Sequence, residues 1–215
     1  MTKRRKLLVY VLILAGVLMI LSPFIKEGII NYISTHLNQK DISAAEISRN
    51  NERKASFDYN AIRSPSFMNT LKDSTQIDSN AIIGRIKIQS VGLSLPIMKG
   101  TTNSNLLAGA TTMRPDQKMG NGNYPLAGHH MRNSNLLFGP LMKIKVGAKI
   151  VITDLKKDYI YKVTSKEIIN ASQSHVIKNT HEKLITLITC DRATSTNKRL
   201  FVRGKLIEVT NHNDN

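Results

Sequence analysis

An uncharged stretch of 19 residues, Leu7 to Ile25, follows a short N-terminus that carries four basic residues and no acidic one. A helix of this length spans about 28 Å, which is close to the thickness of the hydrocarbon core of a bilayer. A cleaved signal peptide also starts with basic residues before an apolar run, but its apolar core is usually shorter. No small-x-small cleavage site follows the run directly, since the nearest candidate lies at 43–45. The sequence therefore predicts an uncleaved transmembrane helix.

The charges on either side of this run predict its orientation. The four basic residues precede it, whereas Lys26 and Glu27 balance each other directly after it. The positive-inside rule then leaves the N-terminus in the cytoplasm and residues 26–215 outside the cell. No second apolar run approaches this length. We therefore expect a single-pass protein of the cell membrane.

The part expected outside carries 27 basic and 15 acidic residues, a formal charge of +12. A basic surface suits polyanions. Nucleic acid is not expected as a partner, because the domain faces outward and lacks a basic patch interleaved with aromatic residues. Anionic lipid headgroups or envelope polymers fit better. The chain has one Cys, which excludes an internal disulfide and most cysteine-based zinc sites.

Composition and periodicity divide the chain into five segments. We expect a cytoplasmic N-terminus at 1–6, the transmembrane helix at 7–25, an extracytoplasmic stalk at 26–75, a folded domain at 76–209 and a C-terminal tail at 210–215. The stalk is rich in Ser, Asn and Lys, so we expect it to be loosely packed, with one short helix near its middle.

From residue 81 the pattern changes to short stretches in which apolar residues recur at every second position. This period predicts strands. The expected strands lie at 82–88, 93–98, 124–127, 150–154, 159–169, 184–189 and 200–209. One or two helical turns are expected at 105–113. Short strands at this spacing indicate an all-β barrel or sandwich, and about 130 residues suffice to bury a core of their own.

Cys190 ends an apolar strand and is followed by Asp191. A lone Cys is more often an inert buried residue. Outside the cell, however, an unpaired thiol oxidises or cross-links, so its presence at a strand end is consistent with a displayed nucleophile. Such a nucleophile requires neighbours that favour the thiolate.

Two residues could act with this thiol. His129 follows a Gly at a strand end, and Arg199 begins the strand after Cys190, so both could reach the same end of a sheet. A His can serve as acid and base in acyl transfer. An Arg stays protonated and can only stabilise an oxyanion or bind substrate carbonyls. Either residue alone is more often structural, and the remaining histidines, His130 among them, are expected at the surface.

Three motifs resemble those of sortases, which are membrane-anchored cysteine transpeptidases of the Gram-positive cell envelope. Thr186-Leu187-Ile188-Thr189-Cys190-Asp191 is similar to their active-site motif. Ala127-Gly128-His129 resembles their His motif, and Lys198-Arg199-Leu200-Phe201-Val202 resembles their Arg-bearing strand. The motifs occur in the family's order, and the N-terminal anchor fits as well. The resemblance implies a closed β-barrel of about eight strands with short helices in its connections.

The resemblance also implies a mechanism on an LPXTG-type sorting signal. Cys190 would attack the Thr–Gly bond, His129 would protonate the leaving amine and later deprotonate the incoming one, and Arg199 would stabilise the intermediate. The same resemblance implies that Thr189 borders the oxyanion region and that Ala127 and Ile188 line the pocket for the Leu-Pro of the signal. The implied partners are LPXTG-bearing surface proteins, the cell membrane and the amino group of a lipid-linked peptidoglycan precursor, which resolves the thioester.

The single N-terminal anchor and the motif ending in Cys-Asp resemble class A, the housekeeping type. Some members of this class use calcium bound in the loop before the His strand. Here the stretch 113–121 has one acidic residue, Asp116, between two basic ones. Calcium prefers several oxygen ligands. We therefore expect no cofactor and no requirement for calcium.

Three alternatives stay open on the sequence alone. A pilin-polymerising sortase would share the three motifs, but it commonly adds a lid and a C-terminal span. A hydrolytic cysteine peptidase would transfer the acyl group to water instead of an amine. A non-catalytic, basic envelope-binding module would not need Cys190.

Overall fold

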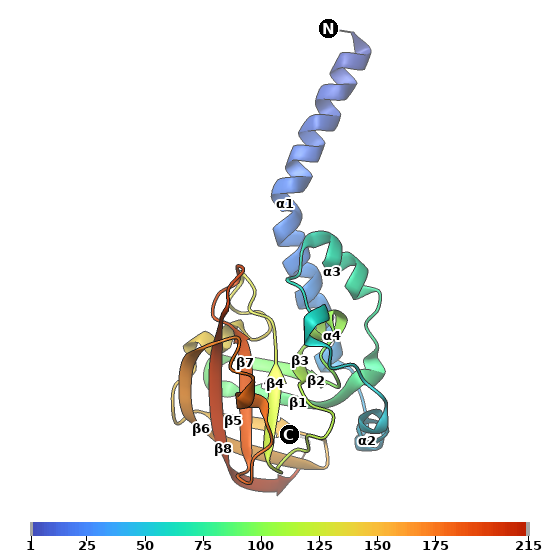
Figure 1. Cartoon of the computed structure of the whole chain (residues 1–215). Helices are drawn as coiled ribbons and strands as arrows, with labels where there is room; N and C mark the ends of the chain where they lie inside the picture. Colours follow the sequence, from blue (N-terminus) through green and yellow to red (C-terminus); the bar gives the residue numbers. More distant parts are fainter. Residues whose placement is uncertain (1, 214–215) are drawn as a thin grey trace.

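The computed structural model describes residues 2–213 (Figure 1). A long helix, α1 (Lys3–Gln39), leads from the N-terminus to a barrel, and three shorter helices follow: α2 (Ala44–Glu52), α3 (Phe67–Ser74) and α4 (Asn103–Ala108). Short 3-10 turns lie at Tyr59–Ala61, Ser79–Ala81, Gln89–Val91, Gly139–Lys143 and Ser174–Ile177.

Eight strands in this described part close into a barrel in the order β1-β2-β3-β4-β7-β8-β6-β5. Their bounds are β1 (Ile82–Ile88), β2 (Leu93–Met98), β3 (Ala110–Thr112), β4 (Asn123–Ala127), β5 (Lys149–Thr153), β6 (Lys157–Asn170), β7 (Leu184–Cys190) and β8 (Lys198–Asn211). β1 closes the barrel by pairing with β5 as well as with β2. Most pairs are antiparallel, but β2 with β3 and β4 with β7 are parallel. The expected all-β barrel of eight strands is confirmed.

The period-2 stretches form strands because one side of each faces the barrel core. In β1, Ile86 and Ile88 are fully buried, whereas Lys87 between them is exposed. Isoleucines of β5 and the apolar residues Ile185 and Leu187 of β7 join the same core. The region expected as helical turns, 105–113, differs from the expectation, since α4 ends at Ala108 and β3 follows it directly.

The expected C-terminal tail, 210–215, is partly strand. β8 continues to Asn211, because its last residues pair with the start of β6, where Lys157 lies opposite Asn211. Residues 214–215 of that tail, and residue 1 of the expected cytoplasmic segment, lie outside the described residues.

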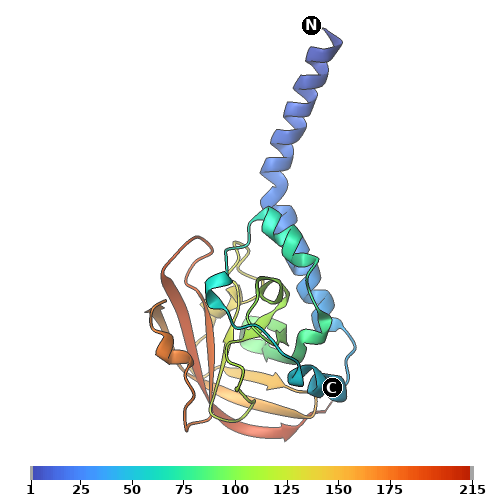
Figure 2. The ribbon, with the colours of Figure 1, turned by 45° about the vertical axis from the view of Figure 1, so that its right-hand side comes forward.

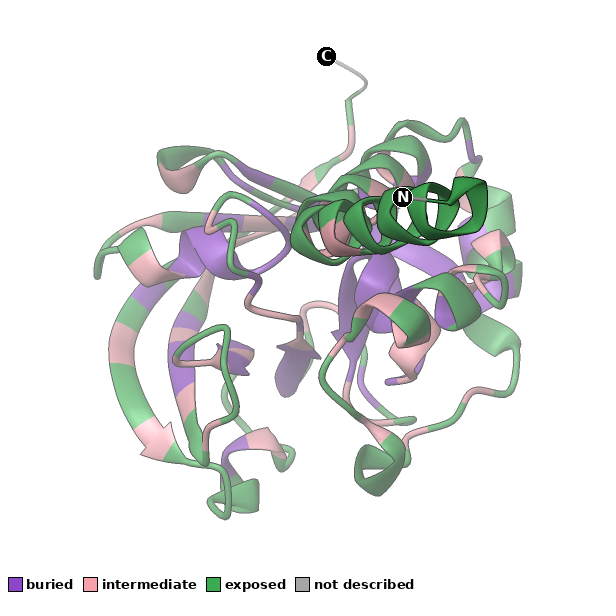
Figure 3. Ribbon diagram, turned by 90° about the horizontal axis from the view of Figure 1, so that it is seen from above, coloured by how far each residue is buried: buried purple, intermediate pink, exposed green. Residues whose placement is uncertain are grey.

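Within residues 2–213, α1 is the one helix long and apolar enough to cross a membrane. Its apolar part is exposed on all sides, as the view along the helix shows (Figure 3). Leu7 is 65% exposed and Ile20 is 71% exposed, so this part has no buried face. A helix that is apolar all round suits a hydrocarbon environment. The helix continues without a break past Ile25, where the apolar run ends, to Gln39.

Segment 26–75 is packed on the barrel, which differs from the loose structure that its polar composition indicated (Figure 2). The second half of α1 buries Ile30 and Leu37, and α2 buries Ile47. Leu37 and Ile47 form a small core with Ile82 of β1. α2 begins at Ala44 because Ser43 and Glu46 form a capping box. A few well-placed apolar residues therefore suffice to order a segment that is mostly polar.

Candidate active site

The three residues singled out in the sequence lie at one end of neighbouring strands. β7 runs between β4 and β8. In the antiparallel ladder of β7 and β8, Cys190 lies directly opposite Arg199. In the parallel ladder of β4 and β7, Ala127 lies opposite Ile188. His129 follows the end of β4 by two residues, at the same end of the sheet as Cys190.

A groove of about 400 Å³ joins these residues. Its lining includes all six positions that the sequence indicated: Ala127, His129, Ile188, Thr189, Cys190 and Arg199. Apolar side chains from other elements complete its wall, among them Leu106, Ile169 and Val176. A groove with an apolar wall and a few polar groups at one end is typical of a site for a peptide or a small molecule.

At the end of β7, successive side chains point alternately toward the groove and toward the core. Ile188 and Cys190 are partly exposed, whereas Leu187 is fully buried and Thr189 is 2% exposed. The Thr189 side chain therefore lies on the side of the core, and its hydroxyl has no hydrogen-bond partner among the described residues. Cys190 and Ile188, by contrast, share the side that faces the groove.

His129 is held in the neutral form at pH 7. Burial lowers the pKa of this imidazole to about 4, and the positive charge of Lys26 on α1 adds to the effect. A neutral imidazole can accept a proton, so His129 is suited to take the proton of a nearby thiol.

Gly128 is required beside His129 because of packing. A Cβ on this residue would lie 2.5 Å from the ring of Phe138, far inside normal contact distance. The backbone N–H of Phe138 donates to the carbonyl oxygen of His129 at 3.0 Å. The close approach of the Phe138 ring is therefore the reason that this position is a glycine.

His130 lies closer to the nucleophile's backbone than the sequence indicated. Its Nδ1 is 3.0 Å from the carbonyl oxygen of Cys190, to which it donates a hydrogen bond. This bond ties the segment after β4 to the end of β7. No local pattern indicates this contact, because its two partners lie 60 positions apart in the chain.

Arg199 is partly exposed, and its guanidinium donates hydrogen bonds to one carbonyl oxygen of the β7–β8 connection and to one at the start of β8. Nη1 lies 3.1 Å from Thr196 O and 3.0 Å from Lys198 O. The fork of the guanidinium has five N–H donors, so these two bonds leave others for a ligand in the groove.

The N-terminal segment supplies one wall of the groove, which the sequence did not indicate. Tyr59, Ile62, Arg63 and Ser64 all line it. A hydrogen bond fastens this segment to α4, since the backbone N–H of Arg63 donates to Asn103 Oδ1 at 3.0 Å. The polar composition of the segment concealed this role.

The segment after β6, residues 171–177, also lines the groove, and Asn123 of β4 fastens it. Asn123 is fully buried, and its amide donates to Val176 O and Lys178 O, both at 3.0 Å. Thr186 of β7 donates to the amide oxygen at 2.8 Å. One buried side chain therefore links β4, β7 and the wall of the groove.

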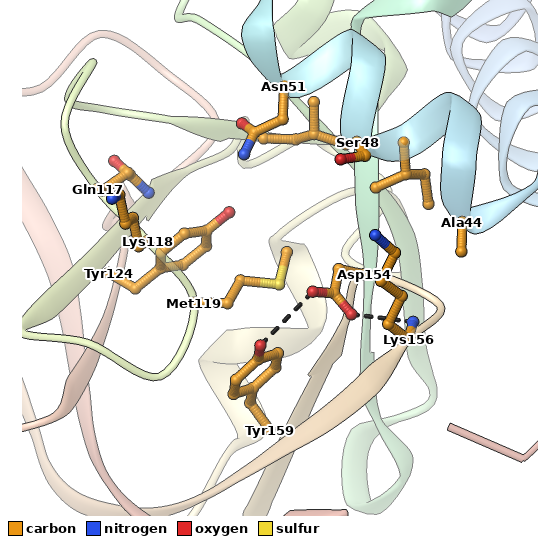
Figure 4. A pocket seen from close by; sticks show the side chains of 12 residues that line it. Ala44, Ser48, Asn51, Gln117, Lys118, Met119, Tyr124, Asp154, Lys156 and Tyr159 are labelled. Atoms are coloured by element: carbon orange, nitrogen blue, oxygen red, sulfur yellow. Dashed lines mark hydrogen bonds between the residues drawn. The ribbon is translucent and has the colours of Figure 1, made fainter. Parts of the chain in front are cut away.

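A second cavity, of about 310 Å³, lies between α2 and the β5–β6 turn (Figure 4). Tyr159 and Asp154 meet there at 3.5 Å, and the backbone N–H of Lys156 donates to the same carboxylate at 3.0 Å. This cavity is lined by none of the six positions that the sequence indicated. It lacks a Cys or His, so the groove at Cys190 is the better candidate for acyl-transfer chemistry.

The loop before β4 contains Asp116, the one acidic residue considered for calcium. Both of its carboxylate oxygens accept hydrogen bonds from Arg114, at 2.9 and 3.0 Å. This ion pair lowers the pKa of Asp116. Throughout residues 2–213, no three His, Cys, Asp or Glu residues gather in a group able to hold a metal ion.

A closed barrel with Cys, His and Arg around one groove defines a class of protein, and the chain belongs to it: the sortase family of cysteine transpeptidases. The family described as "Sortase domain" matches residues 86–207, which carry all three motifs. This match confirms the resemblance that the motifs indicated.

Similar proteins narrow the class. Sortase A of Listeria monocytogenes is 47% identical over 202 residues, which cover 94% of this chain and 91% of that protein. Sortase A of Streptococcus agalactiae is 35% identical over 94% of this chain and 84% of that protein. The crystal structure of the Listeria monocytogenes sortase A superposes with a TM-score of 0.62 at 51% identity, covering 62% of this chain and 92% of that one. These matches confirm the expected resemblance to class A.

Proposed function

We propose that this chain is a membrane-anchored transpeptidase that cleaves an LPXTG-type sorting signal between Thr and Gly and transfers the new carboxyl end to an amine. The observation that carries the proposal is the groove in which Cys190, His129 and Arg199 meet. The names of the similar proteins, Sortase A, support it.

The first half of the reaction forms a thioester. The thiol proton of Cys190 passes to the neutral imidazole of His129, and the thiolate attacks the carbonyl carbon of the substrate Thr. Arg199 donates hydrogen bonds to the oxyanion that develops. The C–N bond then breaks, and the imidazolium of His129 gives its proton to the leaving Gly amine.

The second half returns the enzyme to its starting state. An amine attacks the thioester carbon, and His129 takes the proton that the amine loses. The C–S bond breaks, the Cys190 thiolate leaves, and the imidazolium protonates it. We propose the amino group of a lipid-linked peptidoglycan precursor as the acceptor, because it lies in the same compartment as the catalytic domain.

The substrate's Leu-Pro would occupy the apolar part of the groove next to Ala127 and Ile188. Both residues are partly exposed on the groove side, at register positions opposite each other. Thr189 contributes through its backbone, since its side chain lies on the side of the core.

The charge pattern around the apolar part of α1 supports an N-terminus in the cytoplasm and a catalytic domain outside. In that arrangement, residues 7–25 span the membrane and the helix continues into the folded domain.

The partition of the acyl group between amine and water tests the proposal. Full-length protein in detergent is mixed with an LPETG peptide, with and without a glycine-peptide or diaminopimelate acceptor, and the products are measured by mass spectrometry. We expect the amine product to exceed the hydrolysis product. A hydrolytic cysteine peptidase would give the free acid at the same rate with and without the acceptor.

A further inference from the structure

Helix α3 buries polar side chains and exposes apolar ones, the opposite of what is usual for a surface helix. Thr70 is fully buried and Asp73 is 5% exposed, whereas Met68 is 70% exposed and Leu71 is 39% exposed. Asp73 is compensated by Arg63, whose Nη2 lies 3.0 Å from its carboxylate. A surface helix normally turns its apolar residues to the core. Here Thr70 and Asp73 face inward and Met68 and Leu71 face out, while Phe67 at the start of the helix is half-buried.

The exposed apolar residues of α3 form one surface. Met68 and Leu71 are three positions apart and Lys72 is four positions from Met68, so all three lie on the same side of the helix. Lys72 is exposed as well. A lysine can extend its charge to a polar boundary while its stem covers apolar surface. An apolar stripe edged by a basic residue is the pattern of a helix that lies in a membrane interface.

This surface lies close to the point of α1 at which the apolar run, residues 7–25, ends. Both ribbon views show the N-terminal end of α3 beside α1, at the level where α1 joins the folded part (Figures 1 and 2). Lys26, the first residue after the apolar run, donates from Nζ to Pro65 O at 3.0 Å. Phe24, just before it, is 69% exposed. The N-terminal end of α3, with the exposed Met68, therefore lies beside the end of the apolar surface of α1.

A second basic residue is held at the same level. The backbone N–H of Asn133 donates to Glu27 Oε1 at 3.2 Å, which places the loop with the exposed Arg132 against the same turn of α1. Arg132 is thus held near the point where the apolar run ends, and Lys72 follows on the exposed face of α3. Basic side chains at this depth favour the phosphate groups of lipids.

We propose that the outward face of α3, formed by Met68, Leu71 and Lys72, inserts into the lipid headgroup region of the membrane that α1 spans. This inference rests on the membrane anchor proposed above. Because the membrane then holds both α1 and α3, the folded domain has a fixed tilt relative to the bilayer. Ser64 lines the groove and precedes Pro65, so this arrangement opens the groove next to the bilayer, on the side of the lipid-linked amine proposed above.

The chain contains no Trp, so a single introduced Trp reports on its own position. Met68→Trp places the reporter on the proposed surface. Ile207→Trp is the matched control, because Ile207 is 51% exposed and lies near the C-terminal end of β8, at the end of the barrel away from the N-terminus (Figure 1). Leu18→Trp reports on the span itself. Each full-length variant is placed as a single copy in nanodiscs with plain lipids or with lipids brominated close to the headgroup.

We expect brominated lipid to lower the Met68→Trp emission by roughly twofold, since an interfacial helix buries its apolar face about 5–10 Å deep. The Ile207→Trp emission should not change. Equal emission of Met68→Trp in the two lipids, with Leu18→Trp still quenched, overturns this proposal and leaves the anchor intact. A blue-shifted Met68→Trp emission that bromine does not quench also overturns it, because it indicates contact with protein. Cleavage of a soluble LPETG peptide by the same variants checks the proposed function separately.

Discussion

Cys190 and Arg199 lie directly opposite each other in the antiparallel ladder of β7 and β8, and both line the groove that contains His129. A register pair is set by the whole ladder, from Leu184 opposite Lys205 upward. The distance between thiol and guanidinium is therefore determined by the most regular part of the barrel, while His129 reaches the same groove from β4.

Replacement of Arg199 tests the role of the guanidinium. We expect Arg199→Ala to lower kcat/KM for an LPETG peptide by about 10²–10³, the usual effect of removing one oxyanion donor. Because Arg199 is partly exposed, the free energy of unfolding should change by less than about 0.5 kcal/mol. Steady-state kinetics and urea unfolding measure the two effects.

Arg199→Lys is the matched control. It keeps the charge but loses the planar fork, so kcat/KM should stay at least about tenfold below that of the unchanged protein. Full activity in Arg199→Lys would mean that a positive charge is enough and that no directed hydrogen bond is needed.

The depressed pKa of His129 predicts how stability depends on pH. In the unfolded chain this imidazole takes up its proton near pH 6.5, and in the folded protein near pH 4. Between these values the unfolded state binds more protons, so the free energy of unfolding falls as the pH is lowered from about 6.5 to about 4. Urea unfolding at a series of pH values measures the slope, and His129→Gln should flatten it.

The exposed His181 supplies the control, since His181→Gln should leave the slope unchanged. Lys26→Met should raise the pKa of His129, because the positive charge that adds to the depression is gone. An NMR titration of the His129 ring gives this pKa directly. A pKa that falls, or stays the same, in Lys26→Met would contradict the assigned cause.

Asn123 holds a wall of the groove in place. Asn123→Ala removes both donors to the 171–178 segment and the acceptor of Thr186. We expect a several-fold higher KM for the peptide and a loss of about 1–3 kcal/mol in the free energy of unfolding, because buried polar groups lose their partners.

Thr186→Val separates the two effects of that change. It removes the bond between β7 and Asn123 but keeps both bonds from Asn123 to the wall of the groove. Stability should fall and KM should stay close to that of the unchanged protein. An equal rise of KM in both variants would contradict this, because it would show that the rise does not come from losing the bonds between Asn123 and the wall.

Calcium should have no effect on the rate. Asp116 is engaged through both oxygens by Arg114, so it cannot bind a cation without giving up an ion pair. Peptide cleavage by the full-length protein with EDTA and with millimolar calcium measures this. Several-fold activation by calcium would contradict the prediction.

Much of the barrel could be predicted because apolar residues recur at every second position in several of its strands. Ile86 and Ile88 face the core with Lys87 between them, and the motifs around Cys190, His129 and Arg199 stand at strand ends. Strand ends are where a ladder brings residues together that are distant in sequence, which is why the candidate site could be inferred from motif order.

Other features depend on contacts that no local pattern indicates. Asn123 and His130 act through bonds to residues more than 50 positions away, so their types alone are uninformative. The groove wall from Tyr59 to Ser64 comes from a polar stretch that resembles a linker. In α3 the burial of Thr70 and the exposure of Met68 oppose the usual rule, and they depend on how α3 packs against α1 and α4.

The mass of the enzyme after reaction tests the central claim most directly. Full-length protein is mixed with an LPETG peptide without an acceptor, quenched in acid and analysed by intact-mass and peptide mapping. We predict an adduct equal to the peptide cleaved after Thr, located on Cys190, removed by hydroxylamine, absent in Cys190→Ala and strongly reduced in His129→Ala. An unmodified enzyme during turnover, or the same adduct in Cys190→Ala, would contradict the account.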